Sequence, residues 1–373
     1  MRKKYVVITL IVALLISLAA LVLVSCADDT GKFTVTFVAD GQTVATVQCK
    51  QNATTVKMPD VPGKYGYEGH WEPFSLNGND LTVQAVYEPK QYTVVFDYGN
   101  AEYKPVQQAI FTFDSAVGSL PETLKSNNYF VGWYWRDLRI TPDYVWETDV
   151  EDTVVLTAKW IPSLQAINYQ FKTDLNAYCV VSVDRNSTEV VVPSSYNGYP
   201  VAAISSQAFA YCLNLKSVLI PHSVSSIGNV ALFAYSDSIE SITIHPDNQY
   251  YYSEGNCIIS KSTNKLIAGT CSSVIPSGVK TIGKFAFGKV GFSTFTIPDG
   301  VEYIEEVAFV GCVELTSVFI PASVRSIATS AFYQCTQMTT IYFGGTFDQW
   351  NQLDKYGYFF RVNTSLERVI CLG

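Results

Sequence analysis

One short phrase recurs through the second half of this 373-residue chain and constrains its fold more strongly than any other feature. The phrase reads Ile-Pro, two residues, Val, two residues, Ile, three residues, Ala, and it starts at Ile220, Ile275, Ile297 and Ile320. The last three starts are 22 residues (275 to 297) and 23 residues (297 to 320) apart. Repeats of this length are typical of solenoids, in which each unit is one supersecondary turn stacked on the next. The repeat therefore predicts a β-solenoid that presents an extended surface.

The amino-acid composition favours a mainly β fold and argues against a nucleic-acid partner. The chain has 24 Tyr and 21 Phe residues, and 16% of its residues are charged; aromatic and β-branched residues favour strands. The 25 basic and 33 acidic residues give a net charge of −8, with no basic run after Lys4. Proteins that bind nucleic acid need a basic surface, so we expect none here. A chain of this length is expected to contain two or more structural units.

The N-terminus has the features of an export signal. Three basic residues, Arg2 to Lys4, precede an almost uninterrupted apolar run from Tyr5 to Val24, and Ser25-Cys26 follow immediately. This ending resembles a bacterial lipobox, which implies a signal peptide over residues 1–25 and a diacylglycerol group on the Cys26 thiol. Residues 26–31 would then form a short tether at the membrane. The alternative is an uncleaved anchor, because twenty apolar residues also span a bilayer.

Two similar stretches between the tether and the repeats predict two small β-modules. Phe33–Phe37 and Tyr92–Phe96 both alternate at the strand period, and Asp40-Gly41 between two such runs indicates a hairpin. The stretches over 32–89 and 90–161 resemble internalin-type B-repeats, which implies β-grasp-like modules that act as a stalk. Their tryptophans, Trp71, Trp133 and Trp160, are expected to fill the small cores rather than to stack on sugars.

The solenoid is expected to span residues 167–373, with a cap at each end. Each Ile-Pro would end a short strand, since proline removes a hydrogen-bond donor and fixes φ. Each repeat alanine would allow a tight bend, with the next residue, usually Phe, in the core; Ala231-Leu232 departs from this pattern. The stretch between Pro246 and Pro276 is longer and is expected to protrude. These repeats resemble the BspA-type leucine-rich repeat of bacterial surface and adhesive proteins.

Eight cysteines follow Cys26, and none of them forms a CxxC pair. Cys212, Cys312 and Cys335 each lie four residues after a repeat alanine, so they are expected to stack as an internal ladder. We favour buried thiols in a fixed core position. A disulfide between Cys312 and Cys335 remains open, because they lie on consecutive coils.

The sequence shows no catalytic or cofactor-binding motif, so we predict a protein that is not an enzyme and holds no metal or cofactor. The three histidines, His70, His222 and His245, lie in different units without a ligand nearby, and we interpret them as surface or turn residues. Adjacent acidic pairs such as Glu305-Glu306 diverge on a strand or turn and do not resemble a catalytic pair.

What remains is a surface, and the outward strand positions of the repeats are its candidate residues. The predicted ligand-binding residues are Leu219, Thr243, Thr296, Phe319 and Tyr342, together with Tyr250, Tyr251 and Tyr252 on the long coil. Ordinary solvent-facing strand residues are the alternative interpretation.

These observations predict a monomeric, membrane-anchored lipoprotein at the bacterial cell surface whose solenoid binds an extracellular protein or glycan, as in adhesion. One alternative is an envelope-organising protein that binds peptidoglycan or another surface protein of its own cell. Another is a degradative enzyme or its carbohydrate-binding subunit.

Overall fold

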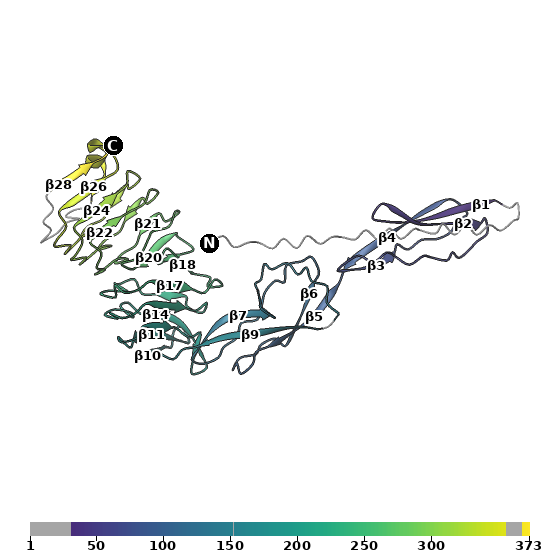
Figure 1. Cartoon of the computed structure of the whole chain (residues 1–373), viewed down its shortest axis with the longest axis horizontal. Coiled ribbons are helices and arrows are strands. Elements are labelled where there is room, and N and C mark those ends of the chain that lie inside the picture. Colours follow the sequence, from purple (N-terminus) through teal and green to yellow (C-terminus); the bar gives the residue numbers. More distant parts are fainter. Residues whose placement is uncertain (1–30, 152, 356–367) are drawn as a thin grey trace. The chain divides into compact units, whose positions relative to one another are not determined.

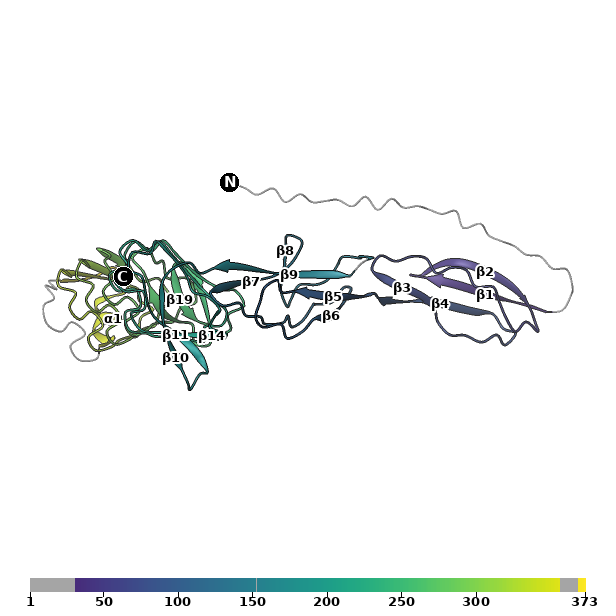
Figure 2. The ribbon, with the colours of Figure 1, turned by 90° about the horizontal axis from the view of Figure 1, so that it is seen from below.

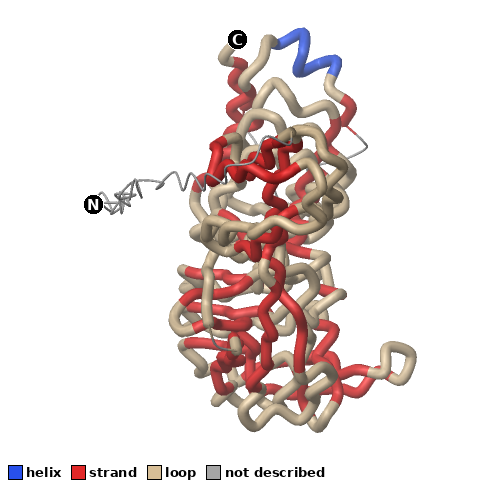
Figure 3. Tube along the Cα trace, turned by 90° about the vertical axis from the view of Figure 1, so that its right-hand side faces the viewer, coloured by secondary structure: helices blue, strands red, loops and turns tan. Residues whose placement is uncertain are grey.

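A computed structural model describes residues 31–151, 153–355 and 368–373, and the protein is mainly β, as predicted. The predicted signal peptide and Cys26 lie outside the described residues. Within those residues no helix has the length and apolar character needed to cross a bilayer. Strands and loops dominate Figure 3, where helix α1 (Phe347–Gln352) lies near the C-terminus.

The chain forms two compact units. The first comprises Met1–Val94, Ala109–Gly118 and Pro142–Val154, and the second comprises Val95–Gln108, Ser119–Thr141 and Val155–Gly373. The division therefore passes through the stretch predicted as the second β-module. The predicted domain limits remain predictions.

The first β-module is a four-stranded sheet whose strand order is β2-β1-β4-β3 (Figure 2). Its strands are β1 (Lys32–Ala39), β2 (Gln42–Lys50), β3 (Tyr67–Trp71) and β4 (Leu81–Pro89). Asp40 and Gly41 have φ values of 46° and 77°, so the predicted hairpin between β1 and β2 is present. Strands β1 and β4 run parallel. The core contains alternate residues of β1, among them Phe33 and Phe37.

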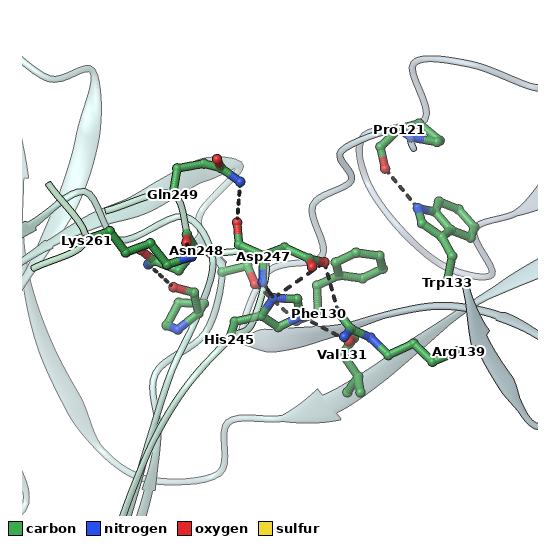
Figure 4. A network of polar contacts seen from close by, with 12 residues as sticks. Pro121, Phe130, Val131, Trp133, Arg139, His245, Asp247, Asn248, Gln249 and Lys261 are labelled. Carbon is green, nitrogen blue, oxygen red and sulfur yellow. Dashed lines mark hydrogen bonds and ion pairs between the residues drawn. The ribbon is translucent and has the colours of Figure 1, made fainter. Parts of the chain in front are cut away.

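The second β-module repeats this topology with the strand order β6-β5-β9-β7-β8. Its strands are β5 (Gln91–Asp97), β6 (Gln108–Thr112), β7 (Asn128–Trp135), β8 (Leu138–Ile140) and β9 (Val154–Pro162). The indole N–H of Trp133 donates to the carbonyl of Pro121 at 2.9 Å (Figure 4), and Trp71 donates to Pro59 at 2.8 Å in the first module. Trp133 is buried, as predicted for a core tryptophan. The shared contact supports the sequence similarity of the two modules.

The solenoid begins with a cap and continues as parallel strands stacked coil on coil (Figure 1). The cap and the first coils contain β10 (Ile167–Lys172), β11 (Ala177–Val183), β12 (Glu189–Val191), β13 (Ser195–Tyr196), β14 (Tyr199–Ile204), β15 (Ser217–Ile220), β16 (Ser226–Ile227) and β17 (Ser241–Ile244). The long coil contributes β18 (Tyr251–Glu254), β19 (Cys257–Ser260) and β20 (Lys265–Gly269). The later coils contain β21 (Thr281–Ile282), β22 (Thr294–Thr296), β23 (Tyr303–Ile304), β24 (Ser317–Ile320), β25 (Ser326–Ile327), β26 (Thr340–Phe343), β27 (Asp354–Lys355) and β28 (Arg368–Cys371).

Each coil bends at a pair of left-handed residues that bracket the buried alanine and phenylalanine. The first residue of each pair, with φ between 45° and 59°, is Gln207, Ala231, Phe285, Val307 or Ser330, and the second is Tyr211, Tyr235, Lys289, Gly311 or Gln334. The bend therefore depends on backbone conformation next to the alanine, and the alanine supplies the small side chain beneath it.

This pattern corrects the expected alignment of the second coil. Ala231 is the left-handed residue there, so Leu232 takes the position that alanine holds in the other coils, and Phe233 takes the core position. Its ring stacks on that of Phe209, with 5.6 Å between the centroids. The second coil has one extra residue before its bend and keeps the phenylalanine.

The later coils share a continuous phenylalanine stack. Phe309 lies 5.2 Å from Phe287 and 5.0 Å from Phe332, measured between ring centroids, and all three rings are fully buried. Because each ring packs on those of its neighbours, adjacent coils stabilise one another, as expected for a solenoid.

The predicted cysteine ladder is present as buried thiols, and the eight cysteines of the described chain are free. The thiols of Cys312 and Cys335 each donate a 3.1 Å hydrogen bond to the phenylalanine carbonyl of the preceding coil, at Phe287 and Phe309. Ser236 makes the same contact with Phe209 at 2.7 Å. Cysteine or serine thus donates one hydrogen bond from this core position in three coils, whereas the buried Val290 fills the same position with an apolar side chain in another.

The long coil does not protrude as expected. Strands β18, β19 and β20 form an antiparallel meander, and β20 pairs in parallel with β21. The side chains of Cys257, Ile258 and Ile259 are fully buried, and the exposed residues of this coil lie at its turns, among them residues 261–264 and Tyr250. The apolar residues of the insertion extend the core because they alternate with the same period as the strands beside them.

The C-terminal stretch forms the predicted cap. Thr346 begins helix α1 with a capping box, in which its hydroxyl accepts from the Gln349 amide and the Gln349 side chain accepts from the Thr346 amide. Trp350 is buried and packs edge-on against Phe343, with 5.3 Å between the ring centroids. Trp350 therefore closes the core of the last coil, as predicted.

Candidate functional site

Five of the predicted surface residues lie at outward strand positions of the solenoid. Together with Val274, at the corresponding place before Ile275 in the long coil, and Ile370 of β28 they form the outer row, defined as Leu219, Thr243, Val274, Thr296, Phe319, Tyr342 and Ile370. Leu219 lies opposite Thr243 in the pair β15–β17. Thr296, Phe319, Tyr342 and Ile370 lie opposite one another in turn along β22, β24, β26 and β28. A parallel sheet spaces such residues about 4.8 Å apart.

The long coil divides the outer row into two sheets, β12-β15-β17 and β22-β24-β26-β28. At the end of the first sheet, the Ser253 hydroxyl accepts from the Ile244 amide, and the Asn256 side chain accepts from the Ile242 amide. These two side chains accept the hydrogen bonds that the backbone of a next strand would otherwise accept. The outer row is two short segments rather than one uninterrupted stripe.

Val274 and Ile370 belong to the outer row but were not predicted. Val274 precedes the buried Ile275 as Phe319 precedes Ile320, and it is 72% exposed. The Ile-Pro phrase at Ile275 marks its position. Ile370 was missed because the C-terminal stretch abandons that phrase, and only its pairing with Tyr342 identifies it.

Phe319 and Tyr342 form the apolar centre of the second segment. Both side chains are half-buried, and they lie opposite each other in adjacent strands. A Cβ atom on Gly344 would lie 3.1 Å from the tip of the Phe319 ring, so the glycine makes room for the ring. Ser317 and Thr340 lie opposite each other two residues earlier on the same strands, and the Arg368 guanidinium donates to Thr340 at 3.3 Å. Aromatic side chains held in place on a polar background are suited to anchoring a partner.

The three tyrosines of the long coil are not equally exposed. Tyr250 is 53% exposed, whereas Tyr251 and Tyr252 are half-buried and pack against the two core clusters of the solenoid. The buried side chain of Asn248 fixes this turn, because its oxygen accepts from the amides of Tyr250 and Tyr251 at 2.9 and 2.8 Å. Of the predicted tyrosine patch, Tyr250 is therefore the member best placed for contact.

His222 and His245 were expected to be separate surface or turn residues, and the structure corrects this expectation. Their rings lie 5.4 Å apart on adjacent coils, and His245 is buried. The Asp247 amide donates to Nδ1 of His245 at 3.2 Å, so Nε2 carries the proton and donates to the Val131 carbonyl at 3.0 Å (Figure 4). The contact was missed because residues 245 and 131 are far apart in the sequence.

A β-bulge exposes the Val131 carbonyl for this contact. The register between β7 and β9 shifts between Phe130 and Gly132, which leaves Val131 unpaired. Gly132 has a φ of 141°, and a Cβ there would lie 2.7 Å from Nε of Arg139. The Arg139 guanidinium in turn pairs with Asp247 at 2.9 Å. We call this set of contacts the histidine junction; it comprises Val131, Arg139, His222, His245 and Asp247. The histidine junction joins the second β-module to the solenoid within the second compact unit.

Burial lowers the pKa of His245 to about 4, and the neighbouring His222 and Arg139 act in the same direction. Burial also lowers the pKa of His222. The histidine junction therefore holds two neutral imidazoles at neutral pH.

The described ranges hold no candidate metal centre, and burial affects the reactivity of two of their thiols. Within them no group of three or more His, Cys, Asp and Glu residues could hold a metal ion. Burial raises the pKa of the Cys257 thiol to about 12 and that of Cys312 well above its usual value, so these thiols are poor nucleophiles.

Comparison with known families agrees with the stacked architecture. The model of the BspA-type leucine-rich repeat region matches residues 182–273 and 267–370 in six copies, which is more than half of the chain. The chain belongs to the BspA-type leucine-rich-repeat family. All seven outer-row residues of this leucine-rich-repeat region lie inside the matched ranges.

Several solved leucine-rich-repeat structures show partial likeness. A leucine-rich repeat protein from Eubacterium ventriosum is 21% identical, with 43% of this chain and 54% of that chain covered and a TM-score of 0.33. The leucine-rich repeat protein of T. pallidum is 25% identical, with coverage of 48% and 83% and a TM-score of 0.31. The pneumococcal vaccine antigen PcpA is 18% identical, with coverage of 52% and 59% and a TM-score of 0.35. The chain thus spans little more than half the length of the first and third.

A search of the curated proteins finds no match. The family assignment therefore rests on the repeat model, and the leucine-rich-repeat solenoid is the part of the chain to which it applies.

Proposed function

We propose that this protein is a non-enzymatic, exported surface protein whose leucine-rich-repeat solenoid binds an extracellular protein or glycan, as in adhesion. The observation that carries the proposal is the second segment of the outer row, where Phe319 and Tyr342 lie in register among hydroxyl side chains. Half-buried rings lose little conformational freedom on binding, so they serve as anchors at low entropic cost. Tyr250 and Leu219 are secondary contact candidates.

Replacing both Phe319 and Tyr342 by alanine is expected to weaken binding by roughly 1,000-fold, since each anchor residue typically contributes about 2 kcal/mol, or about 30-fold. The full chain and the double variant are probed in parallel on an array of extracellular-matrix proteins and glycans. The matched control is Tyr303→Ala, which removes an exposed tyrosine from β23 in the other solenoid sheet. If the control weakens binding as much as the double variant, the outer row is not the binding face.

The alternative is an envelope-organising protein that binds peptidoglycan or another surface protein of its own cell. The same outer row would serve this function, so the identity of the bound ligand distinguishes the envelope-organising function from adhesion. Sedimentation of the full chain with isolated cell wall, without binding to any matrix protein or glycan on the array, would favour the alternative.

We further propose that Cys26 carries the lipid that holds the protein at the membrane. In a bacterial host, the wild-type chain is expected to incorporate a radiolabelled fatty acid, and Cys26→Ser is expected to abolish the label because the thiol is the site of alkylation. The variant should also leave the membrane fraction. Retention of the label would contradict lipid attachment at this residue, and an unlabelled wild-type chain in the membrane fraction would favour the uncleaved anchor.

A further inference from the structure

The two β-modules can be compared residue by residue, because three landmarks share one offset. Strand β2 ends at Lys50 and β6 ends at Thr112, and the paired residues Pro59 and Trp71 correspond to Pro121 and Trp133. Each pair differs by 62 positions. By this offset, residues 52–58 of the first module correspond to residues 114–120 of the second.

In the second module, the segment after β6 is covered by an extended segment over residues 142–146. The amides of Asp114, Val117 and Gly118 donate to the carbonyls of Trp146, Tyr144 and Pro142 at 2.8 to 2.9 Å, and the Trp146 amide donates back to Ser115 at 3.0 Å. The Trp146 side chain is fully buried and packs on Phe111, with 5.5 Å between the ring centroids. The covering segment therefore contributes both backbone hydrogen bonds and an aromatic side chain.

The first module lacks this cover. Nine residues (72–80) separate Trp71 from β4, whereas 20 residues (134–153) separate Trp133 from β9. No hydrogen bond joins residues 54–58 to residues 72–76 in the described structure, and no described partner accepts from the backbone amides of 54–58. Between the two segments lies an open groove of about 590 Å³. We call it the module groove; it is lined by Thr54, Thr55, Val56, Met58, Trp71, Glu72, Pro73, Phe74, Ser75 and Leu76.

We propose that the module groove binds an extended peptide segment of a partner protein, which adds as a strand where residues 142–146 lie in the second module. The free backbone amides on the groove wall donate hydrogen bonds to the main chain of the added peptide, and apolar pockets receive its alternate side chains. The volume is within the range of ligand sites in proteins.

The lining residues specify the chemistry of this peptide. Met58 is 53% exposed, and Trp71 and Phe74 are half-buried, so the groove floor offers apolar contact. Glu72 is the one charged residue of the lining, and its carboxylate accepts from the Gln84 amide at 2.9 Å. A segment with aromatic or aliphatic side chains at alternate positions, as in Tyr144 and Trp146, fits this floor.

The test is binding of a fluorescein-labelled peptide with the sequence of residues 141–147, Thr-Pro-Asp-Tyr-Val-Trp-Glu, to the full chain by fluorescence anisotropy. Saturable binding is expected, with protection of the amides of residues 54–58 from hydrogen exchange. Met58→Asp is expected to weaken binding at least tenfold, because it places a carboxylate on the apolar floor. Thr55→Pro is expected to weaken it similarly, because it removes an amide that the added strand would use.

The matched control is Ile110→Asp, which places a carboxylate at an exposed apolar residue on β6, outside the module groove. It should bind the peptide within twofold of the unmodified chain. Absence of saturable binding, or equal weakening by the control, would overturn the proposal. So would displacement of the peptide by a chito-oligosaccharide without amide protection, which would identify a glycan site instead.

Discussion

Replacing Phe309 by alanine is expected to lower the free energy of unfolding of the solenoid by about 3 to 5 kcal/mol, the usual cost of removing a buried phenylalanine. Phe309 is fully buried at the centre of the stack between Phe287 and Phe332. It also contacts Phe295, with 5.6 Å between the ring centroids. The cavity would therefore remove contacts with both neighbouring coils at once.

The measurement is denaturant unfolding of the full chain, with hydrogen exchange to identify which strands lose protection. Phe347→Ala is the control, because Phe347 is 64% exposed in helix α1 and its loss should cost less than about 0.5 kcal/mol. A loss below about 1 kcal/mol in the Phe309 variant would show that the stack does not couple the coils.

Lowering the pH from 6.5 to 4 is expected to remove about 3 kcal/mol of stability through His245. The folded state holds its pKa at about 4, against 6.5 for an ordinary histidine. Between these values the unfolded chain binds a proton and the folded chain does not, so stability falls by about 1.4 kcal/mol for each pH unit. The contribution is fully present above pH 6.5 and is lost as the pH falls.

Carboxylates also titrate in this range, so the informative quantity is the difference between the wild-type chain and His245→Gln. Glutamine can still donate to the Val131 carbonyl but does not titrate. The variant is expected to show a pH dependence of unfolding that is shallower by about one proton. His70→Gln, at an exposed position on β3, is the matched control. Identical slopes for the wild-type chain and His245→Gln would contradict a buried neutral imidazole.

Sequence periodicity predicted the features that repeat and missed those that depend on contacts between distant segments. The strand ends at Ile220 and Ile320, the outward positions of Phe319 and Tyr342 and the core position of Cys312 all follow from one local phrase. The pattern could not place the extra residue before Ala231, because alanine at that position also satisfied the phrase.

The histidine junction and the integrated long coil were not predictable for a physical reason. His245 contacts Val131 only because a β-bulge exposes that carbonyl, and a bulge leaves no periodic trace in the sequence. The long coil was expected to protrude because it breaks the 23-residue period. Its apolar residues, Ile258 and Leu266 among them, instead join the core of the coils on either side.

The long coil separates the two sheets of the outer row, and this separation affects how such a solenoid can lengthen during evolution. Strands β22, β24 and β26 repeat the same register, left-handed pair and ring stack, and the long coil lies on one side of them. Duplicating a whole unit there would lengthen the exposed face by about 4.8 Å and add one more side chain to it. Gene duplication could thus adjust the reach of the molecule in fixed steps, while its other half and its attachment to the second β-module stay as they are.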